Sequence, residues 1–479
     1  MKPSSTTPQA LPARPPLAWG LALVLSLVLG LALAAPAAAE TLRLSLDDSV
    51  KAAFDSSQAL KAAAFDVDAA TAAESSARAG LLPHIQADGR YSYTAQILPA
   101  INLPPAMASA FGISSLDFGF HNAYSFGLSA NWDIFSAVSL WRQWQQSTEQ
   151  RRASEAALAD AKDTLKLKVR LAYFQTQLNE TQVRLYSEAL RLAQSQAHDL
   201  DLRLKAGSSS RIDWLTASND ELDRRASYRL SQVDLAAALR DLFALTGQHE
   251  DADVSIPSDD AAGQTLPAHV DQPTLLVQLD NTATLLSKLA SAEGAEFKPQ
   301  QLARLRRLRA QVDAARRAAQ LAFAGHLPMG TVGFRWSDDY PEAPVAQSVD
   351  QQTTSANISL PLFSFGAVQG RVDQQDRLAD AAEQSAGDAT TQARRDWLKG
   401  RDRLAGLRTQ RDLQVQQSQQ TTQLQDMVYK SYKIGGSTFL EVQTTSLQSL
   451  QAGLALAETE TQMLIELANL SALTEGERP

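Results

Sequence analysis

The sequence predicts a mainly α-helical protein with a membrane β-barrel part, built from two tandem repeats. Each repeat is expected to combine a long antiparallel helical hairpin with two β-strands. Three observations predict this class: the chain resembles itself at offsets of 228 to 245 residues, the first copy contains 70 residues without proline or glycine, and each copy contains two segments of alternating apolar and polar residues.

The first 39 residues are predicted to be a secretory signal peptide. Lys2 and Arg14 precede an apolar run over 17–34, and small residues end at Ala39, where cleavage is expected. An uncleaved membrane anchor is the alternative, because this apolar run approaches the length of a transmembrane span. No second apolar run of that length occurs, so we expect an exported chain without a transmembrane helix.

Composition argues against several functions. The chain has no cysteine, which excludes disulfides, thiol chemistry and a lipid anchor at an N-terminal cysteine. Removing the leader with its two basic residues takes the formal net charge from −9 to −11, so no nucleic acid is expected as a partner. An enzyme is the alternative class, but the six histidines are isolated, and no catalytic residue, cofactor or metal is predicted.

Matching segments place the repeats over 40–247 and 297–475. "VDAATAAESSARAGLLP" at 67–83 matches "VDAARRAAQLAFAGHLP" at 312–328, and "ALTG" near the end of the first copy matches "ALTE" near the end of the second. The offset falls by 17 residues between these matches, because the first copy carries a longer loop, predicted to be exposed over 97–118.

Outside the repeats, the stretch 248–296 is rich in Asp, Pro and Gly and is predicted to be an inter-repeat equatorial linker. Its last part, Leu275 to Ala292, reads as a weakly amphipathic helix. Residues 476–479 are a C-terminal tail.

Each repeat contains two predicted strands, at about 84–98 and 121–135 in the first and about 327–337 and 354–363 in the second. Their alternation, rich in aromatic residues, is typical of barrel strands that face lipid. From any one strand, a half-buried sheet of a soluble protein is the alternative. An aromatic girdle is expected near the membrane boundaries: Tyr91, Tyr93, Trp132, Trp336 and Phe363.

Four strands cannot close a barrel, and open sheet edges are not tolerated in lipid because their amides would be unpaired. The chain is therefore expected to oligomerise. A dimer would give about eight strands and a trimer about 12, and the count alone does not choose between them.

The longest helix is predicted over 137–206, about 105 Å at 1.5 Å per residue. A helix of that length needs partners along its whole apolar side. The segments 45–79 and 211–246 together match it, so two shorter helices are expected to stack end to end beside the long one in each repeat. An ordinary coiled-coil stalk is the alternative, but it would not explain strands at one end and a glycine turn at the other.

The hairpin turns are predicted at Gly207 in the first repeat and at Gly435 and Gly436 in the second, because glycine permits the positive φ of a helix C-cap. Asp213 and Glu441 each lie six residues past their turn. In a threefold assembly they would form acidic rings, whereas the alternative is a helix-start carboxylate that interacts with the macrodipole.

Six segments carry a family resemblance: "LSLDDSVKAAF", "ARAGLLP", "DIFS" with "PLFSFG", "LKAGSSSRIDWLTAS", "YKIGGSTFLEVQTTS" and "LFALTG". In this order and spacing, over 41–475, the chain resembles the TolC-like outer membrane factor family. The resemblance implies a homotrimer whose 12-stranded barrel lies in the outer membrane lipid of a Gram-negative bacterium, above a periplasmic α-helical tunnel. It also implies a passive exit duct for a tripartite efflux pump or type I secretion system, joined by a periplasmic adaptor (membrane fusion) protein to an inner-membrane pump of RND, ABC or MFS type.

The resemblance further implies a periplasmic gate at the hairpin tips. In the family a tyrosine and an acid link neighbouring helices there, and Tyr432 and Asp213 occupy those positions. Ser437 stands where the best-known member has an arginine, and Thr444 replaces a second acid, so a looser lock and a single acidic ring from the second repeat, at Glu441, are expected.

A trimeric coiled-coil surface or structural protein is the alternative function. Such a protein would carry its strands at the C-terminus, whereas here the strands are internal and occur twice.

Overall fold

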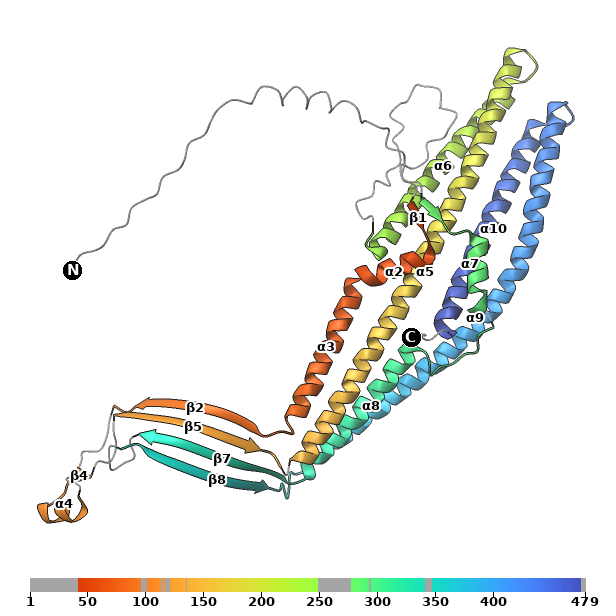
Figure 1. Ribbon diagram of the computed structural model, residues 1–479. Coiled ribbons are helices and arrows are strands. Elements are labelled where there is room, and N and C mark those ends of the chain that lie inside the picture. Colours follow the sequence, from red (N-terminus) through yellow and green to blue (C-terminus); the bar gives the residue numbers. More distant parts are fainter. Residues whose placement is uncertain are drawn as a thin grey trace, which may run out of the picture. The chain divides into compact units, whose positions relative to one another are not determined.

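The computed structural model describes residues 42–95, 101–112, 115–116, 121–134, 136–248, 277–292, 294–340 and 347–474. The predicted signal peptide, most of the predicted linker and the tail at 476–479 lie outside these residues. The chain divides into two units, Met1–Arg43 with Ala252–Gln278, and Leu44–Asp251 with Leu279–Pro479. The long elements all belong to the second unit (Figure 1). Two short strands, β1 (Leu42–Leu44) and β6 (Val277–Leu279), pair with each other.

The first helical hairpin consists of α5 (Ala137–Lys205) and α6 (Arg211–Thr246). With 69 residues, α5 is about 104 Å long. Beyond the end of α6, α5 packs against α2 (Leu46–Ser56) and α3 (Gln58–Ala79) (Figure 1). Shorter helices placed one after the other therefore cover α5.

The segment 45–79, predicted as one helix, is broken at Ser57. The Ser57 side chain accepts a hydrogen bond from the Leu60 N–H at 3.3 Å, while its own N–H closes α2 on Ala53 O at 3.0 Å. Ser57 thus ends one helix and caps the next, and such local side-chain bonds compete with helix continuation.

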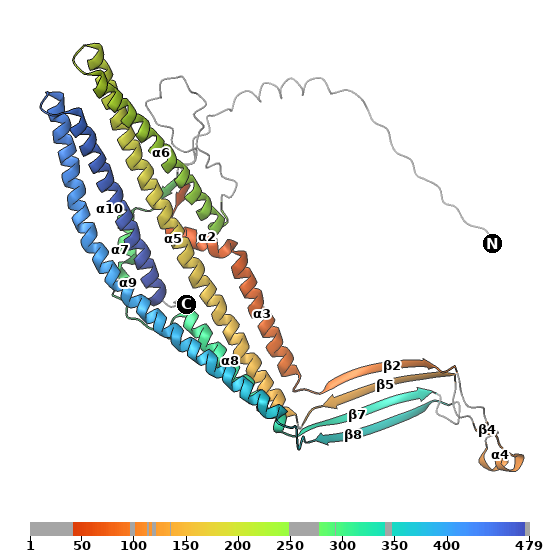
Figure 2. The same cartoon turned by 180° about the vertical axis from the view of Figure 1, so that it is seen from behind.

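The second hairpin consists of α9 (Ala367–Lys433) and α10 (Phe439–Thr474), and α8 (Ala303–Phe323) packs between α5 and α9 (Figure 2). A 3-10 turn, Ala324–His326, follows α8. Buried side chains of α5, α6 and α10 form much of the core, including Tyr173, Phe174, Leu242, Leu464 and Leu467. Within the part of the chain that is described, no helix is both long enough and apolar enough to cross a membrane.

The helix predicted from Leu275 to Ala292 is wrong in its first part. Residues 277–279 form β6, and α7 begins only at Thr282 and runs to Leu289, with a 3-10 turn over Ala290–Ala292. Asn281 sets this start, because its side chain accepts a hydrogen bond from the Ala283 N–H at 2.9 Å.

Tyr173, in the middle of α5, holds the backbone just before α2 and just before α7. Its buried hydroxyl donates to Leu44 O and accepts from the Asp280 N–H, both at 2.7 Å. Gln177, one turn further, donates to Asp280 O at 2.6 Å. Burial raises the pKa of the Tyr173 phenol above its ordinary value, so the hydroxyl keeps its proton.

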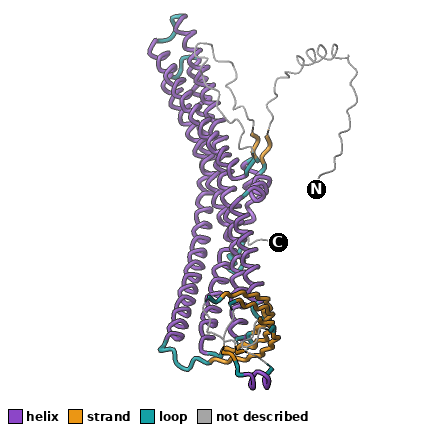
Figure 3. The backbone as a smooth tube through the Cα atoms, turned by 90° about the vertical axis from the view of Figure 1, so that its left-hand side faces the viewer, coloured by secondary structure: helices purple, strands orange, loops and turns teal. Residues whose placement is uncertain are grey.

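Strands from both repeats form one antiparallel sheet in the order β2 (His84–Tyr93), β5 (Asn122–Trp132), β7 (Met329–Tyr340) and β8 (Val349–Ser359). Among the described strands, β2 and β8 each have a partner on one side only. Viewed from the side opposite the hairpin turns, the sheet is strongly curved (Figure 3).

The predicted strand ends need correction, most of all in the second repeat. The strand predicted at about 354–363 runs from Val349 to Ser359, because pairing with β7 sets its ends. Leu360 and Leu362 continue the apolar alternation but lie beyond the last paired residue, and Pro361 between them has no N–H to donate to a ladder. The other strands begin within two residues and end within five residues of the predicted bounds.

The predicted exposed loop at 97–118 contains secondary structure in its described residues. β3 (Ile101–Asn102) pairs with β4 (Ser115–Leu116), and α4 (Pro105–Phe111) lies between them. Proline fits the first turn of this helix, and Gly112, at φ 69°, ends it. The residues 97–100, 113–114 and 117–118 lie outside the described part.

Gly247→Ala should destabilise the protein. Gly247 ends α6 at φ 61°, and a Cβ there would lie 2.4 Å from the Ser56 Cβ. The left-handed backbone alone costs about 1 to 3 kcal/mol for a residue other than glycine. Thermal unfolding should show a lower Tm, whereas Gly294→Ala, where a Cβ meets nothing within 4 Å, should not. Equal Tm values for both variants would contradict this account of the junction.

Candidate functional site

The two hairpin tips use the same backbone turn. Gly207 and Gly435 adopt φ of 72° and 84°. Beyond them, the Ser208 N–H donates to Arg203 O at 2.8 Å, and the Gly436 N–H donates to Ser431 O at 2.9 Å. This is the Schellman motif in both repeats. Gly436 has no positive φ; a Cβ there would lie 2.8 Å from the Ser431 hydroxyl, so close approach explains it.

Asp213 and Glu441 occupy the same position in the first turn of α6 and α10. The Asp213 N–H donates to the Ser210 hydroxyl at 3.1 Å. At the second tip, the Thr438 N–H donates to the Glu441 carboxylate at 2.8 Å, and the Glu441 N–H donates back to the Thr438 hydroxyl at 3.3 Å. Glu441 is thus part of a reciprocal capping box, and both acids also face the positive end of a helix dipole.

Tyr432 lies in a partly apolar contact between the two hairpins. Its ring packs at 5.9 Å on the ring of Phe439, and the Arg203 guanidinium lies 5.1 Å above it. Burial raises the pKa of the Tyr432 phenol, Arg203 opposes this rise, and the charges of Asp213 and Asp199 add to it. The structure therefore brings Tyr432 within electrostatic range of Asp213.

The hydrogen bond between a tyrosine and an acid at the tips is formed by two residues that the sequence analysis did not single out. Tyr429 on α9 donates to the Asp199 carboxylate on α5 at 3.2 Å. The Lys433 ammonium lies 4.5 Å above the Tyr429 ring. The only signal in the sequence for this pair is its spacing. Tyr429 lies one helical turn before Tyr432, and Asp199 lies one turn before Arg203.

A second polar contact joins the hairpins above the tips. Gln443 on α10 donates to the Asp220 carboxylate on α6 at 3.4 Å, and Asp220 also pairs with Arg224 at 3.3 Å. Asp220 and Arg224 are both buried. Breaking a buried pair leaves an uncompensated charge, so this contact favours one register of the two hairpins.

The sheet exposes its apolar face and buries small residues on its polar face. Leu128 and Phe334 are 45% and 46% exposed, whereas Ser129 and Ser337, on the opposite face of the same strands, are 7% and 4% exposed. A sheet of a water-soluble domain has the reverse distribution.

Tyrosines form a row across the end of this apolar face nearest the β2–β5 connection. The rings of Tyr91 and Tyr124 are 5.3 Å apart, and those of Tyr124 and Tyr340 are 6.0 Å apart. Tyr93 stacks on His121 at 5.7 Å just beyond this row.

The other predicted girdle residues occupy different levels. Trp132 ends β5 at the helical side, where its indole donates to Leu81 O at 3.1 Å. Trp336 pairs with Leu128 in the interior of the strands, and Phe363 follows the end of β8 and packs on Phe365 at 4.5 Å.

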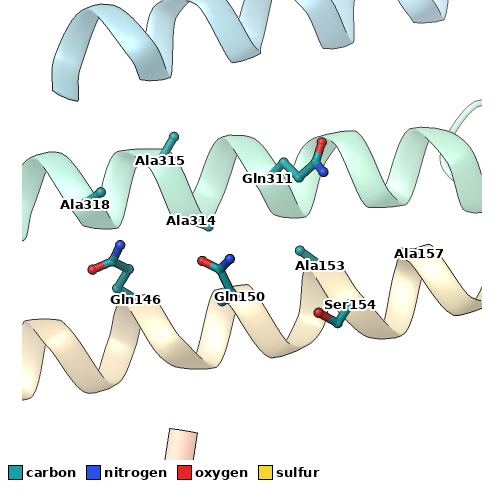
Figure 4. A pocket seen from close by; sticks show the side chains of 9 residues that line it. All are labelled: Gln146, Gln150, Ala153, Ser154, Ala157, Gln311, Ala314, Ala315 and Ala318. Atoms are coloured by element: carbon teal, nitrogen blue, oxygen red, sulfur yellow. The ribbon is translucent and has the colours of Figure 1, made fainter. Parts of the chain in front are cut away.

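An open groove of about 330 Å³ lies between α5 and α8. Alanines line it, with the uncharged side chains of Gln146, Gln150, Ser154 and Gln311 (Figure 4). Amides can donate and accept hydrogen bonds but cannot carry acid–base chemistry. Over the described ranges, no group of three or more His, Asp or Glu residues is arranged to hold a metal ion.

The profile of the family described as "Outer membrane efflux protein" matches residues 50–248 and 300–476. The chain belongs to this family. The resemblance inferred from the sequence motifs is confirmed, as is the predicted class of tandem helical hairpins with two strands each. No curated protein matches the chain by sequence alone.

Solved structures share the fold of this outer membrane efflux protein at low sequence identity. The outer membrane protein VceC of Vibrio cholerae is 18% identical, with a TM-score of 0.69 over 90% of this chain and 96% of its own. The outer membrane channel CmeC of Campylobacter jejuni is 15% identical, with a TM-score of 0.70 over 90% and 85%. The outer membrane channel MtrE of Neisseria gonorrhoeae, in its open state, is 18% identical, with a TM-score of 0.68 over 90% and 89%.

Tyr429→Phe should loosen the hairpin tips of this efflux protein. The loss of this one hydrogen bond to a carboxylate should cost about 1.5 kcal/mol, so the tips should open about tenfold more often. Basic residues near both tips, such as Lys205 and Lys430, allow trypsin to report this opening. We expect faster tip cleavage in the intact protein.

Asp199→Ala should give the same increase, and the double variant no further one. Tyr186→Phe, which removes a hydroxyl from α5 farther from the tip, should cleave at the wild-type rate. Wild-type rates for the Tyr429 and Asp199 variants would mean that this hydrogen bond does not hold the tips.

Proposed function

We propose that this outer membrane efflux protein is a channel-tunnel that serves as the passive exit duct of a tripartite efflux pump or a type I secretion system. An inner-membrane pump would supply the energy, and a periplasmic adaptor protein would join the pump to the hairpin tips. In this role the chain catalyses no reaction. Residues 1–39 would direct export, the sheet would lie in the outer membrane, and the hairpins would lie in the periplasm.

The observation that supports this proposal most strongly is the exposure of the apolar face of the sheet. Side chains such as Leu128 and Phe334 are exposed on one face of the strongly curved sheet, and the polar side chains lie on the opposite face. In water such a face would be a liability, whereas in a bilayer the apolar side faces lipid and the polar side faces an aqueous lumen.

The height of the apolar face fits an outer membrane. Eight residues separate Tyr124 from Trp132 along β5, about 27 Å at 3.4 Å per residue. Barrel strands are tilted by about 40°, which reduces this height to about 20 Å, near the apolar band of about 25 Å in outer-membrane barrels.

The unpaired edges of β2 and β8 support an oligomer. In the order β2-β5-β7-β8 the two edge strands run antiparallel to each other, so the β8 edge of one copy can pair with the β2 edge of the next. Family membership favours three copies and 12 strands. The hairpins of three copies would then surround a tunnel, with Asp213, Tyr432 and Glu441 as its gate.

Phe334→Arg should reduce the yield of assembled trimer. An arginine at mid-bilayer on the lipid face costs about 2 to 4 kcal/mol in each protomer. Ser355→Arg is the matched control, because Ser355 lies one residue from the partner of Phe334 but on the polar face. Heat-resistant trimer measured in extracted outer membranes should fall only for Phe334→Arg, and equal yields would refute the assignment of faces.

Tyr432→Phe with Asp213→Ala should raise single-channel conductance in planar bilayers, because the proposed contact between neighbouring helices at the gate is lost. Glu441→Gln keeps a capping residue but removes its charge, so it should mainly lower cation preference. Asp223→Ala removes an exposed acid farther along α6 and serves as control. If purified wild-type trimer forms no channel, the proposed function fails; if it conducts but these variants do not differ from it, the gate lies elsewhere.

A further inference from the structure

An arginine and an aspartate form a two-pronged ion pair on the polar face of the sheet. Arg335 Nη1 and Nη2 lie 3.1 Å and 2.7 Å from the two carboxylate oxygens of Asp88. Arg335 belongs to β7 and Asp88 to β2, and β5 runs between these strands. The pair therefore spans two strand spacings, about 9.5 Å.

Gly127 on β5 makes this crossing possible. It pairs with Asp88 on one side and Ser337 on the other, so it lies directly beneath the ion pair. A Cβ at Gly127 would lie 3.2 Å from Arg335 Nη2 and 3.0 Å from the backbone oxygen of Trp336. Any side chain here would push against the guanidinium and against a neighbouring strand that cannot yield easily.

The pair is too exposed for stability to be its main consequence. The Arg335 and Asp88 side chains are 44% and 38% exposed, and ion pairs open to solvent add little to folding. The two side chains matter more for the net charge of the polar face than for folding stability. The polar face of the four strands carries four charged side chains, Asp88, Arg90, Arg335 and Asp339, which sum to zero.

We propose that the Arg335–Asp88 pair across Gly127 keeps the inner wall of the barrel electrically neutral, so that passage through the barrel does not depend on the sign of a solute's charge. This inference rests on the proposed channel function. A single unpaired charge would be repeated around the axis in every protomer, and a lumen lined by one sign of charge concentrates ions of the opposite sign. Discrimination by charge would then fall to the acidic hairpin tips and not to the barrel.

Asp88→Asn and Arg335→Gln test the proposal with opposite expected signs. Asp88→Asn leaves one arginine per protomer unpaired in the lumen, so the ratio of anion to cation permeability should rise about threefold or more over wild type. Arg335→Gln should lower the ratio by about the same factor, and the double variant should return near the wild-type value. Reversal potentials across bilayers with a KCl gradient measure all three.

Asp350→Asn is the matched control. Asp350 lies on β8 next to Gln351, the residue in the Asp88–Gly127–Ser337 row, but on the opposite face of the sheet. The substitution Asp350→Asn removes the same charge at the same depth outside the lumen and should leave the permeability ratio unchanged. An equal shift for Asp350→Asn and Asp88→Asn would overturn the proposal, because the effect would then not come from the inner wall.

Assembly and conduction separate the remaining outcomes. Should Asp88→Asn fail to form trimers, the exchange Asp88→Arg with Arg335→Asp restores a pair of reversed direction and should conduct with wild-type selectivity. The proposal predicts a clear shift in selectivity for Arg335→Gln and none for the exchange variant. If both variants form channels of wild-type conductance with identical selectivity, the proposal is refuted. Absence of any wild-type conductance would instead refute the channel function on which it rests.

Discussion

A helix of 69 residues is stable in water only where other helices cover its apolar side, and this requirement shapes the whole helical part. Among the helices that the structure describes, none covers α5 alone. α6 packs beside the half near the tip, and α2 and α3 continue from there, separated at Ser57. The junction is crowded, since a Cβ at Gly247 would meet Ser56 at the end of α2. Before the start of α2, Tyr173 holds the backbone at Leu44 and at Asp280. The second repeat solves the same problem with α8 and α10 along α9.

The sheet obeys the opposite solvent rule from the helices, although both belong to one chain. Helices bury aliphatic and aromatic side chains such as Leu464 and Phe174, whereas the sheet exposes Phe334 and covers Ser337. One sequence can satisfy both rules only if the two parts lie in different solvents. Membership of the outer membrane efflux protein family is consistent with this division. Polar contacts join the long elements: Tyr429 with Asp199 and Gln443 with Asp220 join the hairpins, and Arg335 with Asp88 spans the sheet.

Local patterns were sufficient to predict much of this protein. The glycine turns and the strand faces follow from short-range chemistry, a positive φ and alternation with period two, and the tandem repeat follows from matching segments. Asp213 and Glu441 take part in helix starts, which the sequence left as the alternative to acidic rings. Stacking of short helices beside a long one followed from length alone. The predicted gate residues Tyr432 and Asp213 are within electrostatic range, but the tyrosine-to-acid hydrogen bond formed inside the chain is that of Tyr429.

The sequence by itself determined which segments become helices and strands, because those choices depend on neighbours a few residues apart. Only the tertiary structure decided which residues meet. β8 ends at Ser359 because β7 offers no further partner, not because its alternation stops there. Asp88 and Arg335 are 247 residues apart, and they pair because β5 places Gly127 between their strands. Strand order and register come from packing between distant segments, and one sequence carries no local signal for either.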